Sequence, residues 1–203
     1  MLNKDYLGPG LAAIALAIIF PSYWGYQALL FTDSNFSGSD LVNVSLDLSD
    51  WVFFMLGILE VYIYFSLKRV LADRINFKSI DVLLILIICN SAIFYVGNCA
   101  IDLSVFFLSN MSAERQELAT KTSFFLSAFC MFMYGMLDLL IAIMLLIKFT
   151  ILPTWLRVFA ITSLVLGILE LTFLVEFSII LYPITLLILA IYFLQKPEII
   201  EVV

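Results

Sequence analysis

The sequence predicts an all-α protein, a polytopic membrane helix bundle with six transmembrane helices. Hydrophobic residues make up 64% of the 203 positions and charged residues only 13%, whereas soluble domains average about 45–50% apolar and about 25% charged residues. A soluble fold of this length could not bury so many apolar side chains. The apolar residues also lie in runs of helical length, and not in the short alternating segments of a β-barrel. We therefore expect one membrane-embedded domain over residues 1–203.

Six segments are long enough to cross a hydrocarbon layer about 30 Å thick, which requires roughly 20 residues of helix. The first is too long for the core of a signal peptide, so we expect it to remain in the protein as a helix. The polar stretch 112–121 is rich in helix-forming residues and is expected to extend the fourth helix beyond the membrane. The six predicted spans are residues 7–30, 51–67, 82–101, 122–147, 158–175 and 177–195.

Basic residues predict the orientation of the bundle. If the N-terminus is cytoplasmic, eight of the ten Lys and Arg residues fall on the cytoplasmic side, and only Arg115 and Lys121 fall outside. Cytoplasmic loops of membrane proteins carry such an excess of Lys and Arg. We therefore expect both termini to be cytoplasmic and the protein to be a multi-pass protein of the cell inner (plasma) membrane.

Three acidic residues interrupt apolar spans, and each follows a glycine by three positions. The string LGILE occurs at residues 56–60 and 166–170, and YGMLD occurs at 134–138, which places Glu60, Asp138 and Glu170 in mid-span. A charge at the bilayer centre costs at least about 2.5–3.5 kcal/mol, and no basic residue lies within a span to offset it. Each carboxyl group must therefore stay protonated, share a proton with another acid, or hold a cation. These three acids are the predicted proton, ion or solute site.

The residues around these acids are expected to shape that site. A residue three positions before another lies on the same helix face, so a glycine there allows a neighbouring helix to approach closely. Tyrosines four positions from Glu60 and Asp138 are expected to hydrogen-bond the carboxyl group of their own helix. The predicted packing glycines are Gly57, Gly135 and Gly167, and the supporting polar residues are Tyr64, Tyr134, Asn90 and Ser163.

The composition argues against several other functions. The net charge of −6 disfavours nucleic acid as a partner. The chain has no histidine, and its three cysteines form no recognisable disulfide or metal-binding pattern. No nucleophile elbow, phosphate loop or zinc signature is present. We therefore expect no enzyme activity, no catalytic residues, no metal and no cofactor. The expected partners are the lipid bilayer and, in addition, another membrane protein or a second copy of the chain.

Several interpretations of the acids remain open at this point. They could serve transport of protons, a small cation or a solute, hold the bundle together by interhelical hydrogen bonds, or bind a lipid or another apolar ligand. The two LGILE strings also suggest an inverted repeat, although the flanking helices match poorly. We favour a small transporter or channel. The alternative is a non-transporting membrane partner: an assembly factor, a sensor subunit or an immunity protein against a membrane-acting toxin, with the acidic loop 31–50 as its contact surface.

One resemblance to other proteins rests on the C-terminal part of the chain. The segments LPTWLRVFAITSLVLGILE (152–170) and YPITLLILAIYFLQKP (182–197) combine a Pro-x-Trp-Leu turn, a glycine-containing span and a last helix that ends near a Lys-Pro. This part resembles small bacterial six-span inner-membrane proteins of unknown function. The resemblance implies an inner-membrane protein and assigns no functional residues.

Overall fold

The computed structural model describes residues 4–32, 48–75, 77–107, 113–172 and 175–195, and it contains no strand within these ranges. Each of its six long helices is long and apolar enough to cross a membrane. The prediction of an all-α bundle with six membrane-spanning helices is therefore confirmed. The long helices are α1 (Leu7–Thr32), α2 (Leu48–Ile75), α3 (Asp81–Phe107), α4 (Ala113–Ile147), α5 (Thr154–Leu171) and α6 (Val175–Leu194), and the short 3₁₀ segments are η1 (Lys4–Tyr6), η3 (Lys78–Ile80) and η4 (Phe149–Ile151).

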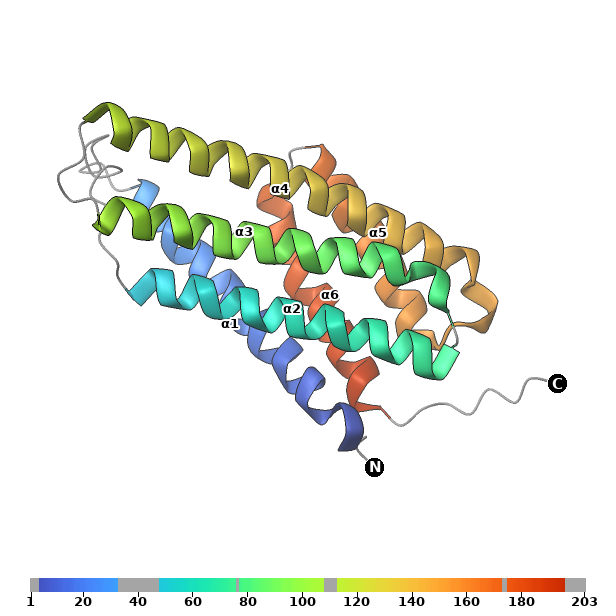
Figure 1. Cartoon of the computed structure of the whole chain (residues 1–203). Helices are drawn as coiled ribbons and strands as arrows, with labels where there is room; N and C mark the ends of the chain where they lie inside the picture. The colour runs from blue at the N-terminus through green and yellow to red at the C-terminus, as the bar shows by residue number, and fades with distance from the viewer. Residues whose placement is uncertain (1–3, 33–47, 76, 108–112, 173–174, 196–203) are drawn as a thin grey trace.

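The six long helices form a ring. Each helix packs against the next one in the sequence, and α6 closes the ring against α1 (Figure 1). Each long helix returns alongside the one before it, so neighbouring helices are antiparallel. The interior of the ring is therefore lined by side chains from helices that are distant in sequence.

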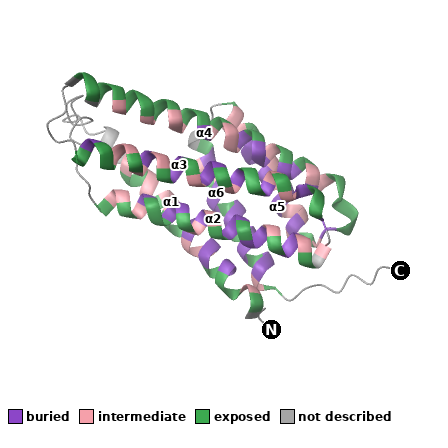
Figure 2. Ribbon diagram, viewed as in Figure 1, coloured by how far each residue is buried: buried purple, intermediate pink, exposed green. Residues whose placement is uncertain are grey.

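The outer surface of the ring is apolar. Figure 2 shows exposed residues along the outward faces of the helices, and these include large hydrophobic side chains such as Ile18, Phe65, Val96, Phe129 and Ile180. Soluble monomers rarely expose such continuous apolar surface. In a lipid bilayer this apolar surface would contact acyl chains in place of water, so its exposure is consistent with an integral membrane protein.

The first and last helices meet at one end of the bundle. The ring of Tyr6, just before α1, stacks on Phe193 near the end of α6 with 6.2 Å between centroids. The turns from α2 to α3 and from α4 to α5 lie at this same end, because the helices alternate in direction. The described basic residues whose backbone lies at this end are Lys4, Lys68, Arg69, Arg74, Lys78, Lys148 and Arg157, whereas Arg115 and Lys121 lie on the opposite part of α4. The assignment of this end to the cytoplasm stays a prediction.

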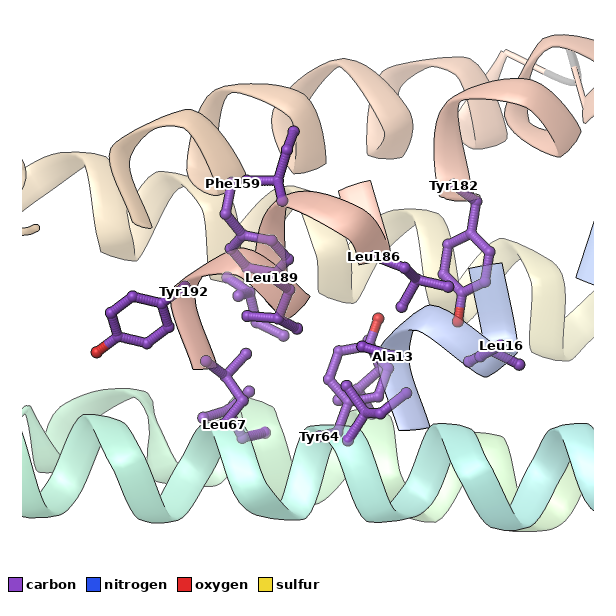
Figure 3. Close-up of a cluster of buried hydrophobic side chains, with 14 of the residues drawn as sticks. Ala13, Leu16, Tyr64, Leu67, Phe159, Tyr182, Leu186, Leu189 and Tyr192 are labelled. Carbon is purple, nitrogen blue, oxygen red and sulfur yellow. The ribbon is translucent and has the colours of Figure 1, made fainter. Parts of the chain in front are cut away.

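The half of the bundle nearest the termini is a dense apolar core. Figure 3 shows part of it, with side chains from α1, α2, α5 and α6 in mutual contact. No charged side chain is buried in this half among the described residues. Fully buried members include Leu67, Leu71, Leu84, Ile87, Leu145, Leu156 and Phe193.

Some helix boundaries differ from the predicted spans. Helix α2 continues to Ile75, because Lys68 pairs with Asp81 at 3.5 Å and so remains in the helix without an unpaired charge. Helix α4 begins at Ala113, so the polar stretch before the fourth span does extend that helix. Helix α5 runs from Thr154 to Leu171, earlier at both ends than the predicted 158–175. At its end, the Thr172 hydroxyl donates to a carbonyl oxygen of the last turn at 2.8 Å.

Candidate functional site

A cavity of about 310 Å³ lies inside the ring, on the side of the core farther from the termini. All six long helices contribute to its wall, and no lining residue is basic. Most of the wall is aromatic or aliphatic, with a few polar groups, as is usual for sites that bind small molecules. The lining residues are Phe20, Trp24, Glu60, Phe94, Tyr95, Met131, Tyr134, Asp138, Glu170, Ser178, Ile179 and Tyr182.

The three predicted acids all line this cavity, although they come from three different helices. Glu60 and Asp138 are each only 4% exposed, and Glu170 is largely buried at the end of α5. Packing of α5 against α4 brings it to the same cavity.

Glu60 on α2 is held by two donors from α3. The Ser91 hydroxyl donates to its Oε1 at 3.1 Å, and the Tyr95 hydroxyl donates to its Oε2 at 2.8 Å. The Ser91 hydroxyl also lies 2.9 Å from the carbonyl oxygen of Ile87, within its own helix. These contacts fix the position of the carboxyl group between α2 and α3.

Asp138 on α4 receives one long hydrogen bond, from the Tyr64 hydroxyl to its Oδ1 at 3.5 Å. Tyr64 was expected to bond Glu60 on its own helix, and it bonds the acid of another helix instead. Figure 3 shows the Tyr64 side chain projecting from α2 into the bundle. The Tyr64 side chain reaches the interior of the bundle because it lies on the same face of α2 as Glu60, and that face points to the bundle centre.

Tyr134 also differs from the expectation. It lies one turn before Asp138, but its hydroxyl faces Glu60. The Tyr182 hydroxyl, from α6, faces Glu60 as well. Both hydroxyl oxygens are buried and point toward Glu60, but they form no hydrogen bond of standard geometry with a described residue. Buried hydroxyls usually have a partner, and Glu60 or a ligand in the cavity can supply it.

Glu170 has a similar unsatisfied atom. Its Oε2 is buried and has no partner among the described residues. A side chain on Gly135 would come within 3.0 Å of the Glu170 Cβ. The absence of a side chain there allows α5 to bring Glu170 against α4 and into the cavity wall.

The glycines permit the close contacts that build the site. A Cβ added at Gly57 would lie 2.5 Å from Cγ of Tyr95, so Gly57 makes room for the ring that bonds Glu60. A Cβ added at Gly167 would lie 2.8 Å from the backbone nitrogen of Leu139 and 2.9 Å from the carbonyl oxygen of Gly135. Backbones approach closely here, as at small-residue crossings in other membrane bundles.

Two predicted residues lie apart from the cavity. Asn90 donates from Nδ2 to the carbonyl oxygen of Cys130 at 3.0 Å, and so links α3 to α4. Ser163 is buried on α5 but is not part of the cavity wall. Both are therefore helix-packing residues in this structure.

The cavity wall and the hydrogen bonds of Glu60 also involve polar residues that the sequence did not single out. Ser91 and Tyr95 lie on the third span, which has no mid-span charge, and Ser178 and Tyr182 lie on the last span. In each pair the residues are four positions apart and share one helix face. That spacing of polar groups in an otherwise apolar span is a signal that could have identified them.

The chemistry available in the cavity is that of hydrogen-bond acceptors and donors in an apolar wall. Carboxyl groups can bind protons or monovalent cations, and aromatic rings attract organic cations. Within the described ranges, no group of three or more His, Cys, Asp or Glu side chains is arranged to hold a metal ion.

Comparisons with known protein families, with curated proteins and with solved structures return no match. The resemblance of the C-terminal part to other six-span proteins therefore stays a prediction.

Proposed function

We propose that the protein is a small membrane transporter that binds a proton or a cationic solute in the carboxylate-lined cavity. One observation carries the proposal: Glu60, Asp138 and Glu170 come from three helices and line one cavity that has no basic residue in its wall. Acids within a membrane span usually mark ion or proton pathways. Three of them in one cavity without a basic partner favour a positively charged cargo.

The geometry favours a carrier over an open channel. The cavity lies on one side of the apolar core, whose side chains, such as Leu67 and Leu145, are fully buried. A continuous pore would need polar or hydrated walls through that half of the bundle. A carrier needs only a site that is reached from one side at a time, and a change in helix packing to expose it to the other.

A purely structural role for the acids explains less. Carboxyl groups that only held the bundle together would have their hydrogen bonds satisfied by neighbouring helices, as those of Glu60 are. The Oε2 of Glu170 has no such partner among the described residues, and the hydroxyls of Tyr134 and Tyr182 point toward Glu60 without a hydrogen bond of standard geometry. Polar atoms directed at a shared cavity favour a ligand as the missing partner.

Flux measurements in liposomes test the proposal. Purified protein is reconstituted with a pH-sensitive dye inside, and proton flux is followed after a membrane potential is imposed; parallel assays use labelled monovalent and organic cations. We expect Glu60→Gln to reduce the flux of the transported species to the level of protein-free liposomes. The matched control is Glu117→Gln, because the Glu117 side chain is 66% exposed and lies far along α4 from the cavity.

The outcomes separate the proposal from its alternative. Flux in the wild type and in Glu117→Gln, with loss in Glu60→Gln, supports a transporter. Absence of any wild-type flux, or equal flux in both variants, refutes it and leaves the non-transporting membrane partner. The contact surface suggested for that alternative, the loop 31–50, lies mostly outside the described residues.

A further inference from the structure

A lateral entrance to the cavity would lie where α5 ends. Helix α5 ends at Leu171 and α6 begins at Val175, whereas α4 continues well past that level. Glu170 at the end of α5 lies against Gly135 of α4. Helix α4 therefore extends about 33 Å beyond the level where α5 ends, because residues 113–135 make 22 helical steps of about 1.5 Å each.

The face of α4 that α5 covers is open beyond the end of α5. Gly135 is covered by α5, and residues four, seven and eleven positions earlier on the same face are Met131, Ala128 and Phe124. Met131 is part of the cavity wall, Ala128 is exposed, and Phe124 is 69% exposed. This apolar stripe therefore runs along the outer surface of α4 directly into the cavity.

Described side chains pack above and below the cavity along the bundle axis. Toward the termini lies the apolar core. In the opposite direction, aromatic side chains pack across the bundle. The Phe53 ring lies 5.9 Å from the Tyr23 ring and 5.4 Å from the Phe94 ring, measured between centroids. The Phe94 ring in turn lies 6.2 Å from the Tyr134 ring. The side opening is flanked by half-buried Trp24 on α1 and Met131 on α4.

The depth of this opening places it in the lipid phase. Met131 is 16 residues from the end of α4 at Ile147, which corresponds to about 24 Å along the helix. That distance is within a hydrocarbon layer about 30 Å thick, in the half of the bilayer farther from the termini. With both termini cytoplasmic, as the sequence predicts, a ligand would enter from the outer leaflet.

The wall of the cavity indicates the head group of such a ligand. Three carboxyl groups provide negative charge or hydrogen-bond acceptors, and the aromatic rings of Phe20, Phe94, Tyr95 and Tyr182 surround them. Carboxylates combined with aromatic faces bind organic ammonium groups well. The Tyr182 hydroxyl adds a further indication: this cavity-lining side chain is only 9% exposed, and its oxygen points toward Glu60 without a hydrogen bond of standard geometry to a described residue.

We propose that the cationic solute of this site is an amphiphilic ammonium compound, which enters sideways from the lipid with its head group at the carboxylates and its tail along the α4 stripe. This inference rests on the proposed function for the idea of a cationic cargo. It adds the class of solute and the route by which the solute reaches the site.

Quenching of Trp24 fluorescence tests the inference in the full-length protein. The chain has three tryptophans, so Trp51→Phe with Trp155→Phe leaves Trp24 as the only one, at the cavity mouth. The protein is placed in neutral phosphatidylcholine nanodiscs and titrated with 12-bromododecyltrimethylammonium, whose bromine quenches tryptophan at short range. The uncharged 12-bromododecanol is the control for simple partitioning into the lipid.

We expect saturable quenching by the cationic probe and only linear, weak quenching by the alcohol. Glu60→Gln should weaken binding of the cationic probe about tenfold or more, since it removes a charge-assisted contact, whereas Glu117→Gln should leave it unchanged. Tetramethylammonium, which lacks the tail, should displace the probe only at concentrations about 100-fold higher or more, because it buries little apolar surface.

Each result supports or overturns a separate statement. Equal quenching by the probe and the alcohol, or equal affinity in the two variants, overturns the inference about the ligand. If that occurs while flux still depends on Glu60, the transporter proposal stands alone. Saturable binding that depends on Glu60, without flux of any cation, supports the ligand class and refutes transport.

Discussion

The contact between Gly57 and Tyr95 offers the most direct test of how the site is built. In Gly57→Ala, the new methyl group would lie 2.5 Å from Cγ and 2.7 Å from Cβ of Tyr95. These atoms are near the backbone of α3, so a small rotation of the ring cannot relieve the clash. Either α2 and α3 separate slightly, or the Tyr95 ring leaves its place and its hydroxyl loses the 2.8 Å contact with Glu60.

The expected cost follows from these two responses. Forcing one extra methyl group into a packed interior costs about 1–3 kcal/mol. Loss of the hydrogen bond from Tyr95 costs about 1 kcal/mol for a neutral partner and more for a charged one. Either response alone relieves the clash, so the two costs are not added together. We therefore expect Gly57→Ala to lower the free energy of unfolding by about 2 kcal/mol.

The assay is reversible unfolding in mixed micelles with increasing sodium dodecyl sulfate, followed by circular dichroism. The control is Gly25→Ala, since nothing lies within 4 Å of the Cβ position at Gly25. That control should be neutral or stabilising by up to about 1 kcal/mol, because alanine favours helix over glycine. Unfolding of both variants at the same detergent fraction would show that Gly57 does not set the position of Tyr95.

Three further predictions concern other parts of the bundle. Tyr64→Phe should lower the free energy of unfolding by less than about 0.5 kcal/mol, because its hydroxyl lies 3.5 Å from Asp138, while Tyr95→Phe should cost about 1 kcal/mol; a larger effect of Tyr64→Phe in the same unfolding assay would contradict this order. Gly167→Ala should cost about 2–3 kcal/mol and weaken the contact between α4 and α5, because the added methyl would meet the backbone of Leu139 at 2.8 Å; unchanged unfolding would argue against that close contact. A green fluorescent protein fused to the C-terminus should fluoresce in bacterial cells, because both termini are expected in the cytoplasm; a dark fusion that is active as an alkaline phosphatase fusion would reverse the orientation.

Much of the fold could be predicted from the sequence. The composition and the length of the apolar runs determined the number and type of the spans, because the bilayer requires backbone hydrogen bonds to be satisfied within each helix. The ends of the helices were predicted less accurately than their number. Charged residues such as Lys68 do not end a helix when a partner such as Asp81 is within reach, so the change in polarity does not coincide with the helix end.

The acids and glycines were also recognisable from the sequence. A carboxyl group in mid-span is costly in lipid, so Glu60, Asp138 and Glu170 could be identified as residues facing the interior before their neighbours were known. The glycine three positions earlier marked the face of close helix contact. These statements depend only on spacing within one helix.

The partners of those residues were decided by the tertiary structure. Tyr64 bonds Asp138, and Tyr95 and Ser91 bond Glu60, although each acid had a tyrosine at helical spacing on its own helix. Periodicity specifies which face a side chain occupies. It does not specify which other helix lies opposite that face, because apolar helices in lipid pack by shape at small residues and carry little directional information in their composition. The cavity lies where α4 continues past the end of α5 and the two helices meet at Gly135, which only the assembled ring determines.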